Sequence, residues 1–206
     1  MSADFTGRWM YWNAMATPGA TDTEIADFNR HYNLTHVPEV VAGNEGFLAG
    51  LRFELLRSAD SLPVGPRWLA IYLMADQSSA DAYITRDRGP AANRPAYTPG
   101  PPVWQTGRRR VWRMIWRRIG SAGSATSPLR LVRMIGLDRL AGTTAGIDAD
   151  SAAVSRLGLF ELYHDFSEQA DAPRYCLIIE PGVDEDTDRW LGSTVRWDYL
   201  YQCVPG

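Results

Sequence analysis

Two of the three histidines in this sequence lie five residues apart, in RHYNLTHVPE (residues 30–39). The ordinary pKa of histidine, about 6.5, permits proton transfer at neutral pH. His36 is therefore the first candidate for acid–base catalysis, and Tyr32 and His31 are the neighbouring candidates. Two other interpretations stay open at this stage: half of a metal site, or a histidine that only caps the end of a helix.

The metal interpretation is the weaker one. A spacing of five places His31 and His36 on different faces of a helix, and no third ligand stands near them. Cys176 and Cys203 are the only cysteines, and they form no C-x-x-C pair of the kind that structural zinc sites use. We therefore expect no metal and no organic cofactor, with both thiols reduced and packed in strands.

A helix before His36 is expected to position the candidate residues. TDTE (21–24) has the pattern of a capping box, which marks a helix start. Ile25, Phe28 and Tyr32 follow at spacings that place them on one face. His36 falls close to Tyr32 on that face, so we expect it to point toward a sheet beneath the helix.

Pro38 sets the expected end of this helix. Proline disfavours helical geometry at the preceding residue, Val37, so we predict that the helix ends near residues 34–35. His31 lies at the edge of the apolar face, where Asp27, one turn earlier, is a ready partner on a solvated surface.

A buried histidine requires polar partners. The strands expected beneath the helix offer Tyr11, Asn13, Arg52 and Glu54 as partners for His36. Tyr11, Asn13 and Arg52 are therefore also predicted to contact a substrate.

The elements that hold these residues repeat along the chain. GFLAGLRFELL (46–56) resembles VSRLGLFELYHDF (154–166), and GPRWLAIYLMAD (65–76) resembles APRYCLIIEPGV (172–183). A helix start follows each pair, and an aromatic strand begins and ends each half. Each half thus reads as strand, helix, strand, strand, helix, strand, the order of a ferredoxin-like βαββαβ unit.

The Gly/Ser-rich stretch GSAGSATSP (120–128) is a linker between two such units, residues 1–119 and 129–206. We predict an α+β fold in which the two antiparallel sheets pack face to face as an intramolecular α/β barrel. The first unit carries the site, because the expected first helix of the second unit, at 142–153, has almost no apolar face. The second helix of that unit is expected at 184–191.

The arginine run RRRVWRMIWRR (108–118) is typical of a strand with surface arginines rather than of a nucleic-acid surface, and contact of these arginines with an anionic ligand stays open. Trp112 and Trp116 share one face of that strand, and the arginines alternate with apolar residues. Aromatic residues in such number either fill a core or contact an aromatic substrate, and both interpretations stay open. Trp9, Trp112 and Trp116 are the tryptophans predicted to contact substrate.

A long Pro/Gly-rich segment, residues 86–107, lies between the expected second helix and the last strand of the first unit. A loop of this length is usually a lid, a partner surface or disordered. As a lid, it would place Tyr97 and Trp104 over the pocket.

Composition excludes several classes of function. All 21 basic residues are arginine, which excludes Schiff-base, pyridoxal and P-loop chemistry. A net charge of −3 argues against nucleic acid as partner. The apolar runs are too short to span a membrane, and the N-terminus lacks a secretory pattern, so we expect a cytoplasmic protein with no membrane partner.

The stretch DFNRHYNLTHVPEVVAGNEGFLAGLRFEL (27–55) resembles the signature of the dimeric α/β-barrel proteins, in particular their EthD-like branch. The likeness covers residues 5–118 well and residues 119–206 faintly, and it departs at His31 and Phe53, where the family usually has tryptophan and tyrosine. The matching residues are Phe28, Tyr32, His36, Val37, Pro38, Gly46, Phe47 and Arg52.

The resemblance implies a fused tandem of a unit that other members use as a homodimer, with a pocket between sheet and helices. Related proteins include cofactor-free monooxygenases, polyketide cyclases, lactone isomerases and haem-dependent enzymes, so the fold alone does not fix the activity. A fused chain is expected to be a monomer or a homodimer of fused chains.

We therefore predict a cofactor-independent lyase, cyclase or isomerase acting on a small hydrophobic, aromatic or polyketide-like substrate. In this prediction His36 moves the proton. Tyr32, Tyr11 or Asn13 orients His36 or stabilises an enolate, and Arg52 holds an anionic group of the substrate. The alternatives are a cofactor-free monooxygenase, a haem enzyme with His36 as axial ligand, and a non-catalytic ligand-binding protein.

Overall fold

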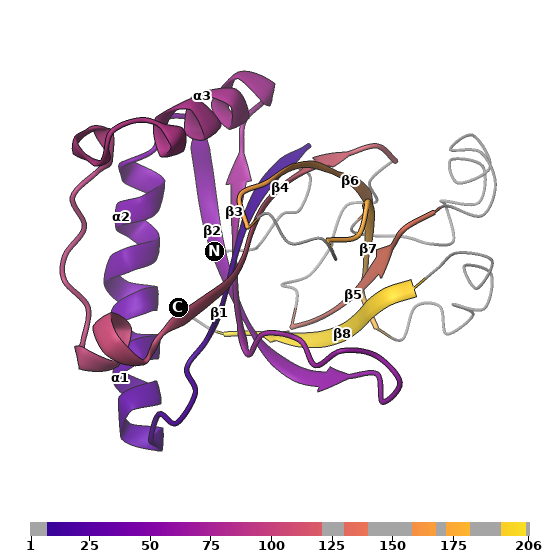
Figure 1. Cartoon of the computed structure of the whole chain (residues 1–206), viewed down its shortest axis with the longest axis horizontal. Helices are drawn as coiled ribbons and strands as arrows, with labels where there is room; N and C mark the ends of the chain where they lie inside the picture. Colours follow the sequence, from indigo (N-terminus) through magenta and orange to yellow (C-terminus); the bar gives the residue numbers. More distant parts are fainter. Residues whose placement is uncertain (1–7, 121–129, 140–157, 168–171, 182–194, 205–206) are drawn as a thin grey trace.

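The computed structural model describes residues 8–120, 130–139, 158–167, 172–181 and 195–204. These residues form an α+β protein built around a closed, eight-stranded antiparallel β-barrel (Figure 1). The strands are Trp9–Ala16 (β1), Phe47–Ser58 (β2), Trp68–Met74 (β3), Arg109–Arg118 (β4), Leu131–Leu137 (β5), Gly158–Asp165 (β6), Tyr175–Ile179 (β7) and Val195–Cys203 (β8).

The order around the barrel is β1-β3-β2-β8-β5-β7-β6-β4, and β4 pairs with β1 to close the ring. Strands from the first half lie as one arc, β4-β1-β3-β2, and those from the second half as another, β8-β5-β7-β6. The arcs join edge to edge, with Phe53 opposite Cys203 on one side and Trp116 opposite Leu162 on the other. The prediction of an α+β fold with a barrel is confirmed.

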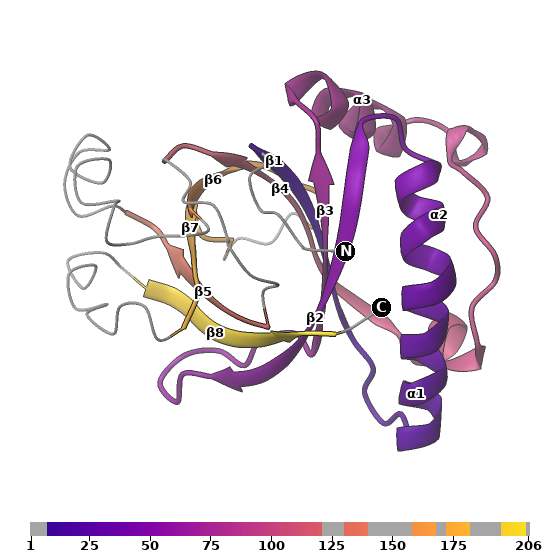
Figure 2. The same ribbon diagram turned by 180° about the vertical axis from the view of Figure 1, so that it is seen from behind.

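The described helices all flank the first arc, outside the barrel (Figures 1 and 2). Helix α2 (Val37–Ala42) lies so close to β2 that a Cβ atom on Gly50 would stand 2.5 Å from the Val37 side chain. None of the described helices is long and apolar enough to cross a membrane. The helical segments are Asp22–His31 (α1), the π turn Tyr32–His36 (η1), Val37–Ala42 (α2), Gln77–Arg88 (α3), the 3-10 turn Ala91–Asn93 (η2) and the π turn Val103–Gly107 (η3).

The prediction that the first helix ends near residues 34–35 is wrong. The capping box forms between Thr21 and Glu24 as predicted, but the helical path continues past Pro38 to Ala42. Proline lacks a backbone N–H, and the chain accommodates it by widening to a π turn just before it. Helices expected at 142–153 and 184–191 lie outside the described residues.

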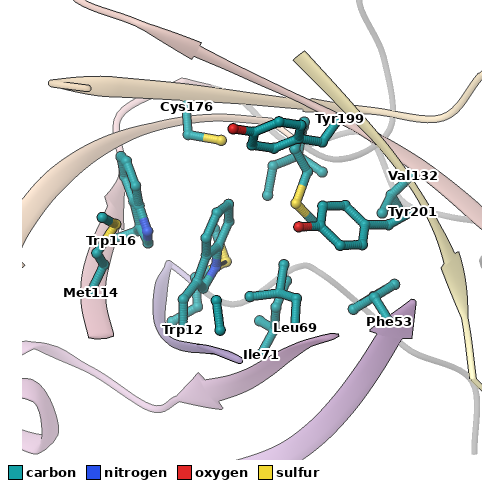
Figure 3. Packing of buried hydrophobic residues seen from close by; sticks show 14 of the residues in the cluster. Trp12, Phe53, Leu69, Ile71, Met114, Trp116, Val132, Cys176, Tyr199 and Tyr201 are labelled. Atoms are coloured by element: carbon teal, nitrogen blue, oxygen red, sulfur yellow. Dashed lines mark hydrogen bonds between the residues drawn. The ribbon is translucent and has the colours of Figure 1, made fainter. Parts of the chain in front are cut away.

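Alternate residues of each strand point to opposite sides of the barrel wall. On β1, Trp12 points inward, whereas Tyr11 and Asn13 lie on the outer face beneath the helices. The barrel centre is filled by large side chains, among them Trp12 and Trp116, whose rings lie 5.2 Å apart (Figure 3). The outer face holds a second cluster, in which helix and strand side chains pack together.

Candidate functional site

The side chains of the helix that face the barrel form a straight row. Phe28, Tyr32, His36 and Val40 follow at intervals of four residues, and none is more than 8% exposed. In an uninterrupted α-helix such a row would drift around the axis by about 40° per step. The π turn over Tyr32–His36 counters this drift because it holds more residues per turn. It therefore keeps His36 beneath the helix, as its spacing predicts.

The His36 ring is enclosed by three aromatic rings. The ring of Trp104 lies 4.5 Å away, that of Tyr32 5.0 Å and that of Tyr97 5.1 Å, each roughly edge to face. The Nδ1 atom of His36 is buried and has no hydrogen-bond partner among the described residues. We refer to these four residues as the histidine cluster.

The surroundings keep His36 neutral at pH 7. Its pKa is lowered to about 4, first by burial and then by the positive charge of Arg108 and by His31. Glu39 acts in the opposite direction but does not offset these effects. A neutral imidazole can accept a proton, and an anionic ligand beside Arg108 would raise the pKa toward the neutral range.

Three tyrosines lie between the helix and the barrel wall: Tyr32 on the helix, Tyr11 on β1 and Tyr72 on β3. The Tyr32 hydroxyl accepts a hydrogen bond from Asn13 Nδ2 at 3.4 Å, and the Tyr11 hydroxyl accepts one from Arg113 Nε at 3.1 Å. Between them Tyr72 stacks on Tyr11, and its buried hydroxyl makes no hydrogen bond of normal geometry within the described chain. Burial raises the pKa of both Tyr32 and Tyr72, so these phenols keep their protons at neutral pH.

Arg52 is a buried cation on the same wall. Its Nη1 atom donates to the side-chain oxygens of Asn29 and Asn33, at 3.0 and 2.8 Å, and its guanidinium carbon lies 4.2 Å from the Tyr32 ring centroid. Burial lowers the pKa of Arg52 to about 10, so the group stays charged at neutral pH. Its Nε and Nη2 atoms have no hydrogen-bond partner among the described residues.

The segment 94–108 covers the His36 ring and supplies Tyr97 and Trp104 of the histidine cluster. Thr98 donates to the Glu39 carboxylate through its backbone N–H and its hydroxyl. The Tyr97 hydroxyl accepts a hydrogen bond from Asn44 Nδ2 at 3.1 Å. Gly100 passes so close to Trp104 that a Cβ atom there would lie 2.4 Å from the indole. Of the interpretations given for this long segment, a cover over His36 matches these contacts.

Most of the predicted site residues share this side of the barrel wall. Trp9 lies farther along β1, where its ring contacts Tyr163 at 4.7 Å. Trp112 and Trp116 point into the barrel, so one ligand cannot contact both them and His36. The residues on the outer face near the histidine cluster are His31, Tyr32, His36, Tyr11, Asn13, Arg52 and Tyr97.

The predicted polar partners of both histidines are wrong. Tyr11, Asn13 and Arg52 lie on the same side of the wall as His36, but their hydrogen bonds go to Arg113, to Tyr32 and to Asn29 and Asn33, respectively. Glu54 accepts hydrogen bonds from Arg67 and Gln202. Asp27 pairs with Arg30, which carries a full positive charge on the same exposed surface, instead of with His31. The His31 ring contacts Trp104 at 5.2 Å.

Sequence reasoning missed Arg108 and Tyr72. Arg108 begins a run of arginines interpreted as strand surface, and its proximity to His36 depends on how the covering segment folds back. Tyr72 stands in a continuous apolar strand, WLAIYLM, whose pattern does not show which residues face the helix. The pairing of Arg52 with Ala70 places Tyr72, two residues farther along β3, on the same face as Arg52, and the sequence alone does not show this register.

No protein-family model matches this sequence, and no curated protein matches it. Within the described residues, no three metal-binding side chains lie together. The function must therefore be argued from the arrangement of the site itself.

Proposed function

We propose that the chain is a fused tandem of two ferredoxin-like units, residues 1–119 and 129–206 joined by the linker 120–128, of the dimeric α/β-barrel type and its EthD-like branch. The support is that both arcs repeat one strand order, β4-β1-β3-β2 and β8-β5-β7-β6. In the first arc, helices follow the first and third strands, as a βαββαβ unit requires.

We further propose that the first unit is an acid–base enzyme of the lyase, cyclase or isomerase type, acting on an anionic aromatic or polyketide-like molecule. The observation that carries this proposal is the neutral, buried His36 with its unpartnered Nδ1 atom. A buried polar atom without a partner costs about 1–3 kcal/mol, and function is a common reason why such an atom is kept.

The proposed chemistry is removal of a proton from a carbon next to a carbonyl group. The C–H bond breaks, its electron pair forms the enolate double bond, and the proton goes to His36 Nδ1. The resulting imidazolium and enolate carry opposite charges. Return of the proton to another carbon gives an isomerisation, and loss of a leaving group gives an elimination.

The surroundings of His36 favour the anion formed in this step. Arg108 lowers the pKa of His36 through its positive charge, and the same charge stabilises a nearby enolate. The Tyr32 hydroxyl keeps its proton because burial raises its pKa, so it can donate a hydrogen bond to the enolate oxygen. Arg52, with two unpartnered guanidinium nitrogens, supplies a further positive charge under the helix.

A substrate reaches His36 only when its cover moves. Trp104 and Tyr97 pack directly on the imidazole, and both belong to the segment 94–108. Opening of that segment admits the substrate, and its return excludes water from the reaction.

A haem on His36 does not fit this arrangement. Three aromatic rings already pack against the imidazole at centroid distances of 4.5 to 5.1 Å. A macrocycle bound there would have to hold the rings of Trp104 and Tyr97 permanently away from the imidazole, whereas a small substrate requires only a transient opening of the cover. Haem is therefore not part of the proposed mechanism.

The test is hydrogen–deuterium exchange at carbon in enolisable aromatic anions, with phenylpyruvate and benzoylacetate as probes. In D₂O, the wild-type protein is expected to accelerate exchange, and His36→Gln is expected to lose that acceleration by roughly 100-fold or more. His164→Gln, a histidine that contacts Phe166 on another part of the barrel, is the matched control and should exchange like wild type. Exchange no faster than buffer with either probe, or equal rates in His36→Gln and wild type, would refute the acid–base role.

A further inference from the structure

A concave site lies on the opposite side of the barrel wall from His36, at one mouth of the barrel. It is a cavity of about 520 Å³, formed by the loop after β2, the starts of β4 and β8, and the segment before β7. Pockets that hold small molecules typically measure roughly 300–1,000 Å³. The lining includes Val64, Trp112, Pro173, Arg196, Trp197 and Tyr199.

The floor of this cavity is aromatic. The rings of Trp112 and Trp197 lie 4.7 Å apart, and Trp112 stacks on Tyr199 at 5.8 Å with planes 27° apart. Beneath them the barrel is filled, since Trp197 packs against Trp12 with ring centroids 6.0 Å apart. Trp12 in turn packs against Trp116, and Figure 3 shows both rings in the interior. The cavity is therefore a closed cup and does not continue as a channel through the barrel.

Two glycines allow these rings to lie flat against the backbone. A Cβ atom at Gly136 would stand 2.2 Å from Trp197 Nε1, and one at Gly65 would stand 2.9 Å from the Tyr199 ring. Neither glycine has a positive φ, so the lack of space for a side chain, and not the backbone conformation, explains why glycine stands at these positions. Any larger residue at these positions would displace the aromatic floor.

The charge at the mouth is balanced. Arg196 is the one charged residue among the described lining, and its Nε donates to the Asp138 carboxylate. By contrast, Arg108 and Arg52 near His36 have no carboxylate contact among the described residues. A ligand of the barrel mouth therefore gains from stacking and from removal of apolar surface from water, and not from a net charge.

We propose that the barrel mouth is a second binding site, which takes a neutral, planar, polycyclic aromatic molecule stacked on Trp112 and Trp197. This site is independent of the proposed acid–base chemistry, because the barrel wall separates the two. It holds the ligand by shape and stacking, and none of its described lining residues is placed to transfer a proton.

The test is a fluorescence titration with the neutral probe N-phenyl-1-naphthylamine. Wild-type protein is expected to bind one probe molecule saturably. Ala172→Trp and Val111→Trp, which fill the cavity from two different sides, are each expected to weaken binding at least tenfold while keeping the wild-type melting temperature. Leu34→Trp adds an indole at a position that is 65% exposed on the helix, and should bind like wild type.

The position of the probe is checked with Trp104→Ala. Binding unchanged in this variant supports the barrel mouth, whereas a change would place the probe at the histidine cluster and overturn the proposal. The absence of saturable binding by wild type, or full binding by both filled variants, would overturn it as well.

Discussion

Aromatic side chains are buried on both faces of the β1–β3–β2 wall, but they surround different groups on each face. Inside the barrel, Trp12 and Trp116 pack with other apolar groups, and the interior centre is filled. On the outer face, aromatic rings surround His36 and Arg52, and the Nδ1 atom of His36 and the Nε and Nη2 atoms of Arg52 are buried without partners among the described residues. A high content of aromatic residues therefore does not by itself locate an acid–base site. The Nε1 atom of Trp116 is also unpartnered inside the described part of the barrel, but an indole does not titrate near neutral pH. The outer face differs because its unpartnered groups are titratable or charged, and burying such groups without a function destabilises the fold.

The first way to test this contrast is to truncate one tryptophan on each side. Trp116→Ala removes a fully buried ring from the barrel centre and is expected to lower the free energy of unfolding by about 3–5 kcal/mol. Trp104→Ala removes a half-buried ring from the cover and is expected to lower it by about 1–2 kcal/mol. Urea unfolding measures both, and equal losses would mean that the cover is part of the structural core.

The second test compares two arginines. Arg113 makes two hydrogen bonds to the Asp87 carboxylate, and both side chains are about 15% exposed. Arg113→Met leaves that carboxylate unpaired and is expected to cost about 3 kcal/mol of stability. Arg52→Met removes a buried charge that has no carboxylate partner, so the loss should be about 1 kcal/mol or less. The reverse order in denaturant unfolding would show that Arg52 is chiefly a structural residue.

The third test uses pH. The folded pKa of His36, about 4, is below the unfolded value near 6.5, so its contribution to stability is complete above pH 6.5 and is lost as pH falls toward 4. Between pH 7 and pH 5 the wild type should lose about 2 kcal/mol more than His36→Gln does. His164 also has a lowered pKa, so His164→Gln serves as the comparison and should keep most of the wild-type loss. Parallel pH profiles for wild type and His36→Gln would contradict the buried, neutral state of His36.

The smallest expected effect concerns the attachment of the cover. Thr98→Val removes the hydroxyl that donates to Glu39. Because this contact is exposed, the melting temperature should hardly change, whereas amide exchange in residues 94–108 should become faster. Asp27→Asn, which breaks an exposed ion pair elsewhere on the helix, is the control and should leave exchange in that segment unchanged. Unchanged exchange in Thr98→Val would mean that the packing of Trp104 alone holds the cover.

Local patterns in the sequence predicted the local parts of the structure. The capping box at Thr21 and the alternation of Trp112 and Trp116 depend on neighbouring residues only, and both hold. The helix end was predicted wrongly because the effect of Pro38 is local, whereas burial of Val40 against the barrel is a tertiary effect that keeps the chain helical.

The sequence also does not predict that the candidate site residues lie on opposite sides of the barrel wall. Tyr11 and Trp112 both appeared as aromatic substrate contacts, yet they end on opposite sides of one wall. Their side depends on strand register, in which Tyr11 pairs with Ile115 and Ala14 with Trp112, and period-two counting within a single strand does not reveal this pairing.

The most direct test of the histidine cluster is a pH titration of the His36 ring by nuclear magnetic resonance. Our account predicts a neutral imidazole with a pKa near 4 in the wild type, because burial is the largest cause of the shift. In Trp104→Ala, where water reaches the ring, the pKa should move up toward the ordinary value of about 6.5. A wild-type value already near 6.5, unchanged by the loss of Trp104, would show that His36 is solvated and would contradict the site described above.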